Sequence, residues 1–173
     1  MVREFITMRD YNLMRRVHRW PAPRWVRVWM LTATRAGDGW LWYAMAAIIL
    51  LFGGPGRFVA VGTSALAAGL GIAAFLFLKR RIGRQRPCAI EPHCWAKLLP
   101  PDRFSFPSGH TITAFAIALS LSAFYPSLLL GLLFCAASIA LSRVLLGMHF
   151  LSDVLAGAAI GSALGRGVVW LVR

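Results

Sequence analysis

Acidic residues are scarce in this 173-residue chain. It holds six Asp and Glu against nineteen Lys and Arg, which gives a formal net charge of +13. The few carboxylates do not cluster, and the four His and three Cys do not form a set with metal-ligand spacing, so no metal site is predicted. The excess of positive charge suits an anionic membrane surface or an anionic substrate.

Charged residues are also missing from long stretches of the chain. Residues 58–78 contain none, and this length fits a helix that crosses a bilayer. Residues 111–142 are uncharged as well. They are too long for one span, and the break at residues 125–127 predicts two short helices that meet in a turn. A last apolar stretch covers residues 150–172.

The first candidate span, residues 28–52, is less uniform because it contains Arg35 and Asp38. These two residues could pair on one helix, since they lie three positions apart. Alternatively, the Gly-Asp-Gly segment at residues 37–39 breaks the helix. Together the runs predict an all-α polytopic membrane bundle of five or six transmembrane helices, because backbone amides in lipid must be satisfied internally.

This composition disfavours two other classes of protein. A soluble all-α protein of this size could not bury so many apolar helices away from water. A nucleic-acid-binding protein would suit the positive charge but not the apolar spans.

Residues 1–27 differ from the rest of the chain. Arg residues are mixed with apolar and Trp residues, which is typical of an amphipathic helix that lies on anionic headgroups. No apolar core or small-residue cleavage site follows the basic stretch, so we do not expect a cleaved signal peptide. We therefore predict an interfacial segment, residues 1–27, and a membrane domain, residues 28–173.

Three short motifs stand next to the apolar runs. In chain order they are Lys79-x6-Arg86-Pro87, Pro107-Ser108-Gly109-His110 and Ser142-Arg143-x5-His149-x3-Asp153. Phosphoryl transfer needs a nucleophile, an acid for the leaving oxygen and fixed cations around the equatorial oxygens. The motifs supply two imidazoles, one carboxylate and three cations, so their combination points to phosphoryl chemistry.

The third motif contains the candidate nucleophile. His149 and Asp153 are four residues apart and share one helical face. Asp153 can accept a hydrogen bond from one ring nitrogen and leave the other as a neutral nucleophile; the alternative is a pair that only caps the helix. Arg143 ends the preceding helix, where a guanidinium can hold two phosphate oxygens or snorkel to the headgroups.

The second motif opens an apolar helix. Ser108 is the predicted N-cap. The free amides around Gly109 and His110, together with the helix dipole, form an anion site. His110 is placed to donate a proton to the leaving oxygen, although a plain cap with an interfacial His is the alternative.

The first motif lies in a run of five cations. Such a cluster can serve only to set membrane topology. The functional interpretation selects Lys79 and Arg86 as phosphate ligands. It assigns Arg80, Arg81 and Arg84 to headgroup contacts.

The three motifs resemble those of the type 2 phosphatidic acid phosphatase superfamily, which includes membrane lipid phosphatases, glucose-6-phosphatase and soluble vanadium haloperoxidases. The resemblance covers roughly residues 28–172 and shows no departure at a catalytic position. It implies a reaction without metal or cofactor in which His149 becomes phosphohistidine, Asp153 orients it, and His110 acts first as acid and then as base for water. It also implies five phosphoryl ligands: Lys79, Arg86, Ser108, Gly109 and Arg143.

We therefore expect an integral-membrane lipid phosphatase. Its substrate would be a lipid phosphate such as undecaprenyl pyrophosphate, phosphatidic acid, phosphatidylglycerophosphate or phosphorylated lipid A, selected by the 88–106 loop and the helix grooves. The rivals are a phosphotransferase that passes the phosphohistidine to a lipid hydroxyl, and a non-catalytic membrane scaffold of the same fold. The spans exclude a soluble haloperoxidase, and motifs gathered at one membrane face disfavour a transporter.

Evidence on sidedness is divided. Cys88 and Cys94 either form a disulfide, which would indicate an oxidising compartment, or remain thiols. The Arg-rich N-terminus and the 79–86 cluster favour the cytoplasm by the positive-inside rule, whereas most bacterial members of the family face the periplasm. We expect a multi-pass protein of a bacterial-type inner membrane with its active site on the periplasmic face.

Overall fold

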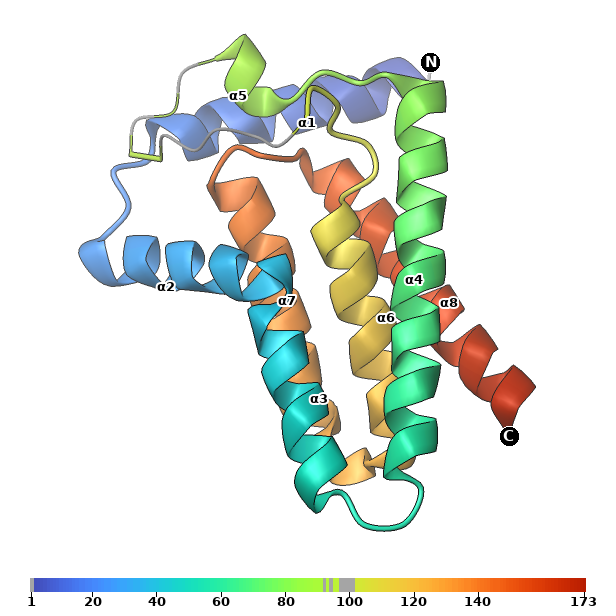
Figure 1. Ribbon diagram of the computed structural model, residues 1–173. Helices are drawn as coiled ribbons and strands as arrows, with labels where there is room; N and C mark the ends of the chain where they lie inside the picture. Colours follow the sequence, from blue (N-terminus) through green and yellow to red (C-terminus); the bar gives the residue numbers. More distant parts are fainter. Residues whose placement is uncertain (1, 92, 94, 97–101) are drawn as a thin grey trace.

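The computed structural model describes residues 2–91, 93, 95–96 and 102–173. Five helices pack side by side as a bundle, and α1 lies across one end of it (Figure 1). The elements in chain order are α1 (Val2–Arg19), α2 (Arg24–Arg35), the π-helical turn η1 (Ala36–Trp40), α3 (Leu41–Phe52), α4 (Arg57–Ile82), α5 (Pro87–Ile90), α6 (Gly109–Phe124), the 3₁₀ turn η2 (Pro126–Leu128), α7 (Leu129–Leu145) and α8 (Leu151–Val172).

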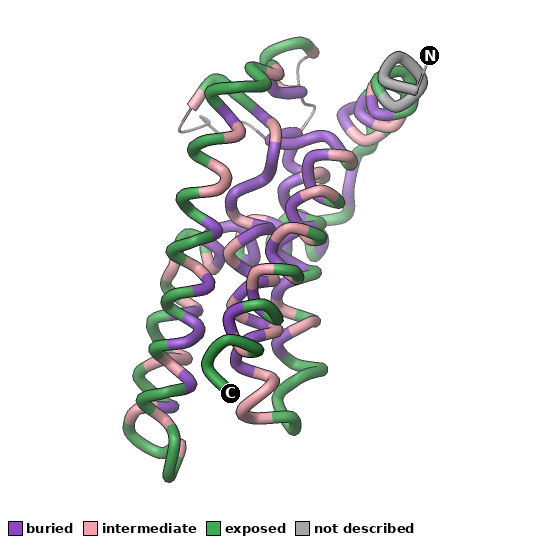
Figure 2. The backbone as a smooth tube through the Cα atoms, turned by 90° about the vertical axis from the view of Figure 1, so that its right-hand side faces the viewer, coloured by how far each residue is buried: buried purple, intermediate pink, exposed green. Residues whose placement is uncertain are grey.

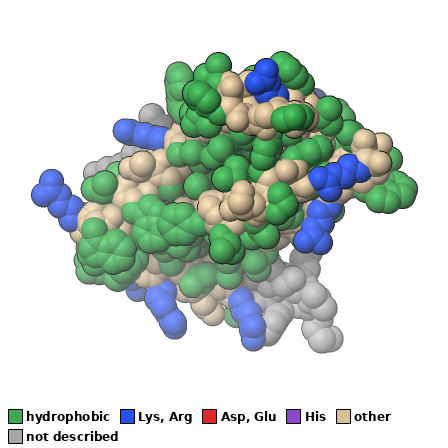
Figure 3. All heavy atoms as spheres, turned by 90° about the horizontal axis from the view of Figure 1, so that it is seen from below, with side chains coloured by type: hydrophobic (Ala, Val, Ile, Leu, Met, Phe, Trp, Pro, Cys, Tyr) green, Lys and Arg blue, Asp and Glu red, His purple; other side chains and the backbone are tan. Residues whose placement is uncertain are grey.

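Among the residues that the structure describes, three segments are long and apolar enough to cross a membrane. They are α4, the combined segment Pro126–Leu145 and α8, and the apolar helix α6 is shorter. Their outward faces carry exposed side chains such as Leu66, Leu130 and Phe134, while the buried positions face inward (Figure 2). The end of the bundle away from α1 is also largely hydrophobic, with Lys and Arg around its edge (Figure 3). So much exposed apolar surface suits lipid rather than water, which confirms the prediction of an all-helical membrane protein.

Residues 28–52 do not form one straight helix. α2 ends at Arg35, η1 follows, and α3 leaves in a new direction (Figure 1). Within η1, Gly39 has a φ of 122°, a conformation open to glycine and unfavourable for other residues. The interpretation of residues 37–39 as a helix break is therefore confirmed. The predicted boundary between residues 27 and 28 falls inside α2.

Glycines on α8 allow it to approach α6 closely. Gly157, Gly161 and Gly165 are four residues apart and share one helical face. A Cβ atom on Gly161 would lie 2.3 Å from the carbonyl oxygen of Ile112, so only small residues fit this interface. The close approach brings the start of α6 to the start of α8, where the amide of Ser108 donates to the carbonyl of Asp153 at 3.2 Å.

The N-terminal helix α1 packs on the protein along one face. Asp10, Met14 and His18 are buried there, while Arg15 and Arg19 on the other side are exposed. The first two thirds of the predicted interfacial segment thus form a helix, and its outer face carries the basic residues Arg15 and Arg19. Its position on lipid headgroups stays a prediction.

Candidate active site

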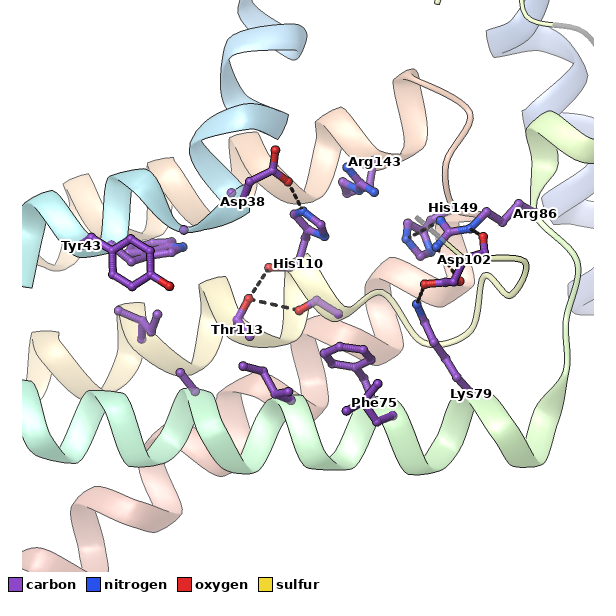
Figure 4. A pocket seen from close by; sticks show the side chains of 18 residues that line it. Asp38, Tyr43, Phe75, Lys79, Arg86, Asp102, His110, Thr113, Arg143 and His149 are labelled. Atoms are coloured by element: carbon purple, nitrogen blue, oxygen red, sulfur yellow. Dashed lines mark hydrogen bonds and ion pairs between the residues drawn. The ribbon is translucent and has the colours of Figure 1, made fainter. Parts of the chain in front are cut away.

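The three motifs meet at the end of the bundle covered by α1. There they surround a cavity of about 610 Å³ (Figure 4). Of the eight predicted site residues, Ser108 and Asp153 are fully buried and the other six line the cavity: Lys79, Arg86, Gly109, His110, Arg143 and His149.

The hydrogen bonds of His149 define its tautomer. Its Nδ1 lies 2.6 Å from the carbonyl oxygen of Ser105, and its Nε2 lies 3.1 Å from Nη1 of Arg86. A carbonyl only accepts and a guanidinium only donates, so the proton resides on Nδ1 and Nε2 presents its lone pair. Burial lowers the pKa of His149 to about 3, which keeps the ring neutral. A neutral imidazole with an unprotonated Nε2 is a competent nucleophile once the substrate phosphate takes over the hydrogen bond from Arg86.

Asp153 lies beside His149, but the two residues do not share one helical face as predicted, because His149 precedes Phe150, the N-cap of α8. Asp153 also does not make the shortest contact to the ring. Its Oδ2 is 3.8 Å from Nδ1 of His149, and the backbone carbonyl of Ser105 takes the closer position. Oδ2 instead accepts from the amide of Phe150 at 2.8 Å. Nothing in the sequence marks Ser105 for this role, because any residue carries a backbone carbonyl.

The first motif holds Ser105 in place. Gln85 and Phe104 form an antiparallel bridge, and the amide of Ser105 donates to the carbonyl of Arg84 at 2.7 Å. The connection after α4 therefore aligns the carbonyl that orients His149.

The assignment of Arg84 to headgroup contacts is wrong. Its guanidinium donates to Asp153 at 2.7 Å and to Asp10 of α1 at 2.8 Å. The side chain turns inward because two buried carboxylates lie within its reach. For Arg80 and Arg81, the headgroup assignment stays a prediction.

Lys79 and Arg86 converge on Asp102, a residue that lies outside the three motifs. Nζ of Lys79 lies 2.5 Å from Oδ2 of Asp102, and Nη2 of Arg86 lies 2.9 Å from Oδ1. The carboxylate thus contacts two of the predicted phosphate ligands (Figure 4). The only signal at Asp102 in the sequence is that acidic residues are scarce in this chain.

Arg143 has an unused donor beside the cavity. Its Nη1 donates to Thr34 of α2 at 2.5 Å. Its Nε is buried and meets no hydrogen-bond acceptor within the part of the chain that the structure describes. A buried donor without an acceptor is costly, and an anionic oxygen in the cavity would relieve that cost.

His110 is paired with a carboxylate from another element. Its Nε2 lies 2.7 Å from Oδ1 of Asp38 in η1. The kink in η1 therefore places a negative charge beside the predicted acid. The sequence also allowed Asp38 to pair with Arg35, but its partner in the structure is His110. A charged residue inside an apolar run was the available signal.

The predicted side-chain cap at Ser108 is not formed. Ser108 occupies the N-cap position of α6, but its hydroxyl accepts from Oγ1 of Thr111 at 2.9 Å. A buried hydroxyl partner on the same turn takes the place of the backbone amide. Gly109 lines the cavity, with Phe75 of α4 packed against it.

The cavity has a charged end and an apolar end. Beyond the motif residues it is lined mainly by α3 and α4, through Trp42, Tyr43, Ile72, Phe75 and Leu76. It therefore suits an amphiphile with an anionic head. The alternative of a disulfide between Cys88 and Cys94 stays open, because Cys94, like residues 97–101 of the loop, lies outside the described residues.

Comparison with known proteins places these features in a family context. The family model of the PAP2 superfamily matches residues 58–173. The chain is 30% identical to the lipid A 1-phosphatase of Rhizobium johnstonii, over 75% of this chain and 61% of that protein. It is 35% identical to the decaprenylphosphoryl-5-phosphoribose phosphatase of Mycobacterium tuberculosis, over 73% of this chain and 68% of that protein. The chain thus spans about three fifths of the length of the first of these relatives.

Two solved structures share the fold. The PAP2-type phosphatidylglycerolphosphate phosphatase of Bacillus subtilis aligns with a TM-score of 0.72 and 25% identity, over 96% of this chain and 85% of that one. LpxE of Aquifex aeolicus aligns with a TM-score of 0.72 and 27% identity, over 92% of this chain and 93% of that one. The likeness therefore covers the helices that carry all three motifs.

Proposed function

Because this chain belongs to the PAP2 superfamily, we propose that it is an integral-membrane phosphatase that hydrolyses a lipid phosphomonoester or pyrophosphate. The supporting observation is a single cavity in which Lys79, Arg86, Arg143 and a neutral His149 meet at one end while apolar side chains line the other. A lipid phosphate has the matching polarity.

The first half of the reaction transfers the phosphoryl group to the protein. Nε2 of His149 attacks phosphorus, the N–P bond forms, and the bond from phosphorus to the leaving oxygen breaks. His110 donates its proton to that oxygen. The cations stabilise the charge on the equatorial oxygens, and the unused Nε of Arg143 is available for one of them.

The second half restores the enzyme. His110, now neutral, takes a proton from water, and the resulting hydroxide attacks phosphorus. The N–P bond of His149 breaks, phosphate leaves, and both imidazoles regain their starting forms. Each step uses side chains of this chain alone, so the reaction is proposed to be independent of metal ions.

The substrate binds with its phosphate at the charged end and its tail along α3 and α4. Lys79 and Arg86 then exchange the carboxylate of Asp102 for phosphoryl oxygens. The panel of candidate substrates contains undecaprenyl pyrophosphate, phosphatidic acid and phosphatidylglycerophosphate. It also contains lipid A and decaprenylphosphoryl-5-phosphoribose phosphate, because two relatives are named as phosphatases of these lipids.

The topology that accords with this site has five spans: α3, α4, α6, α7 and α8. α4 and α7 end at the cavity, whereas α6 and α8 begin there (Figure 1). We propose a periplasmic site in a bacterial inner membrane, with α1 on the outer surface. Reporter fusions test this: a C-terminal fusion should report the cytoplasm, and a periplasmic signal would reverse the orientation.

The test of function is phosphate release by detergent-purified protein and its His149→Ala variant, each with a chelator. Release that needs His149 and survives the chelator supports the proposal, as would inhibition by vanadate, a mimic of five-coordinate phosphorus. Release that stops with the chelator would make the metal-free mechanism wrong. Transfer of phosphate to an added lipid alcohol without release would identify a phosphotransferase. The absence of both activities in folded protein would favour the non-catalytic scaffold.

A further inference from the structure

The N-terminal helix contacts the catalytic dyad through a chain of charges. We infer that Asp10 of α1, acting through Arg84, is a positioning residue that holds Asp153 beside His149. The inference rests on the proposed phosphatase function, and it makes α1 a part of the catalytic apparatus in addition to any role at the membrane surface.

The chain of contacts is short and continuous. Nη1 of Arg84 lies 2.7 Å from Oδ1 of Asp153, and Nη2 of Arg84 lies 2.8 Å from Oδ2 of Asp10. The other oxygen of Asp153 receives the amide of Phe150. One guanidinium therefore bridges two carboxylates that are 143 residues apart in the sequence, one on α1 and one on α8.

A second set of contacts ties Asp10 to the start of α8. The amide of Ser152 donates to Oδ1 of Asp10 at 3.2 Å, and the hydroxyl of Ser152 donates to Oδ2. The hydroxyl also accepts from Nη1 of Arg84 at 2.7 Å. Asp10 is 6% exposed, and such a buried carboxylate is retained at little cost only when it is paired and hydrogen-bonded.

The inner face of α1 packs on the loop that carries His149. The ring of Tyr11 lies 5.5 Å from that of Phe150. His18 lies against Gly147, where a Cβ atom would approach within 2.6 Å of the imidazole. Arg84 also stacks 4.0 Å above the Phe150 ring. The contacts of Tyr11 and His18 fix α1 on the C-terminal side of Asp10, which helps to define the position of its carboxylate.

The electrostatics explain why the bridge is needed. Asp153 is fully buried beside a neutral His149, and an unpaired carboxylate there would be strongly destabilised. Arg84 supplies the balancing charge. Without Asp10, the partly exposed Arg84 would be free to turn toward solvent or headgroups, and Asp153 would lose its restraint.

Neither Arg84 nor Asp10 lines the main cavity. Their loss should therefore lower kcat and leave KM nearly unchanged, since neither touches the substrate. A phosphate-binding role for Arg84 would have the opposite signature, a raised KM. The two roles are separable by steady-state kinetics.

The experiment compares four variants of the full-length protein in detergent: Arg84→Gln, Asp10→Asn, the double variant and Glu91→Gln. We expect kcat of Arg84→Gln to fall about 10- to 100-fold, because a small misplacement of reacting groups can cost up to about 10²-fold. Asp10→Asn should show a smaller fall. The double variant should be no slower than Arg84→Gln, because both residues act through one chain.

Glu91→Gln is the matched control. Glu91 pairs with Arg15 and Arg19 on the outer part of α1, so its loss weakens α1 without touching Arg84. Wild-type kcat in this variant and reduced kcat in Asp10→Asn support the inference. An equal fall of kcat in both variants would show that general docking of α1 causes the effect, and it would overturn the inference.

Other outcomes also decide the matter. An unchanged kcat in Asp10→Asn, or a raised KM with normal kcat in Arg84→Gln, would overturn the inference while the proposed function stands. If Arg84→Gln does not fold, the near-isosteric Asp10→Asn decides alone. Wild-type protein without His149-dependent phosphate release would count against the proposed function itself, a result distinct from all of these.

Discussion

Oδ1 of Asp38 lies 2.7 Å from Nε2 of His110, so each of the two candidate catalytic histidines has a carboxylate beside it. Asp153 supports His149 from α8, and Asp38 reaches His110 from the kink between α2 and α3. The arrangement separates the nucleophile and the acid into two differently supported imidazoles. His149 is kept neutral by burial, while Nε2 of His110 has the carboxylate of Asp38 as its partner.

The scarce carboxylates are concentrated at the site. Of six acidic residues in the chain, four lie at the cavity or in its supports: Asp10, Asp38, Asp102 and Asp153. Each contacts a cationic or imidazole side chain. The low acidic content of the chain is therefore a property of its lipid-facing helices rather than of its chemistry.

Asp38→Asn should slow turnover of substrates with poor leaving groups. The amide keeps the hydrogen bond but removes the charge that favours protonated His110. We expect kcat to fall roughly 10- to 100-fold, which is at most the lower limit of the roughly 10²–10⁴-fold that general acid–base catalysis contributes, because His110 itself is retained. A nitrophenyl phosphate, whose leaving group needs no acid, should be affected much less. Equal losses for both substrate classes would contradict the role assigned to the Asp38–His110 pair.

Asp102→Asn should tighten the binding of phosphate or vanadate, because the carboxylate competes for Lys79 and Arg86. The gain should be modest, up to about fivefold, since partly exposed ion pairs contribute roughly 0.2–1 kcal/mol. Inhibition constants measure it, with Asp102→Glu as the variant that retains the charge. Weaker binding in Asp102→Asn would show that the carboxylate orients the two cations instead of competing.

The same residue predicts an effect of pH on stability. Burial opposes ionisation of Asp102, but Lys79 and Arg86 outweigh it and hold its pKa below the usual 3.8. The ion pairs therefore stabilise the fold above pH 3.8, and the contribution is lost as the pH falls further. The difference in melting temperature between wild type and Asp102→Asn should vanish in that acid range. A difference that persists below it would mean that charge is not the cause.

Gly161→Ala should destabilise the bundle. The new methyl group would lie 2.3 Å from the carbonyl oxygen of Ile112, and such overpacking typically costs about 1–3 kcal/mol. Gly167→Ala on the same helix is the control, because nothing lies within 4 Å of its Cβ position. Thermal unfolding in detergent should separate the two variants. Equal stability would show that α6 and α8 can move apart without loss.

The local chemistry of this protein could be predicted from its sequence because it depends on residue type and spacing. The uncharged residues 58–78 lie in α4, and His149 and Asp153 lie side by side, although His149 precedes α8. The motif order also placed three cations near two imidazoles. Each inference used contacts within one helix or one short turn.

Tertiary packing decided the partners of those residues. The carbonyl of Ser105 at Nδ1 of His149, Asp38 at His110 and Arg84 between Asp10 and Asp153 join positions 44 to 74 residues apart. No spacing rule connects such positions, since a backbone carbonyl or a lone carboxylate has no pattern of its own. They meet because the glycine face of α8 brings α6 close, the turn η1 redirects α3, and α1 packs across the end of the bundle.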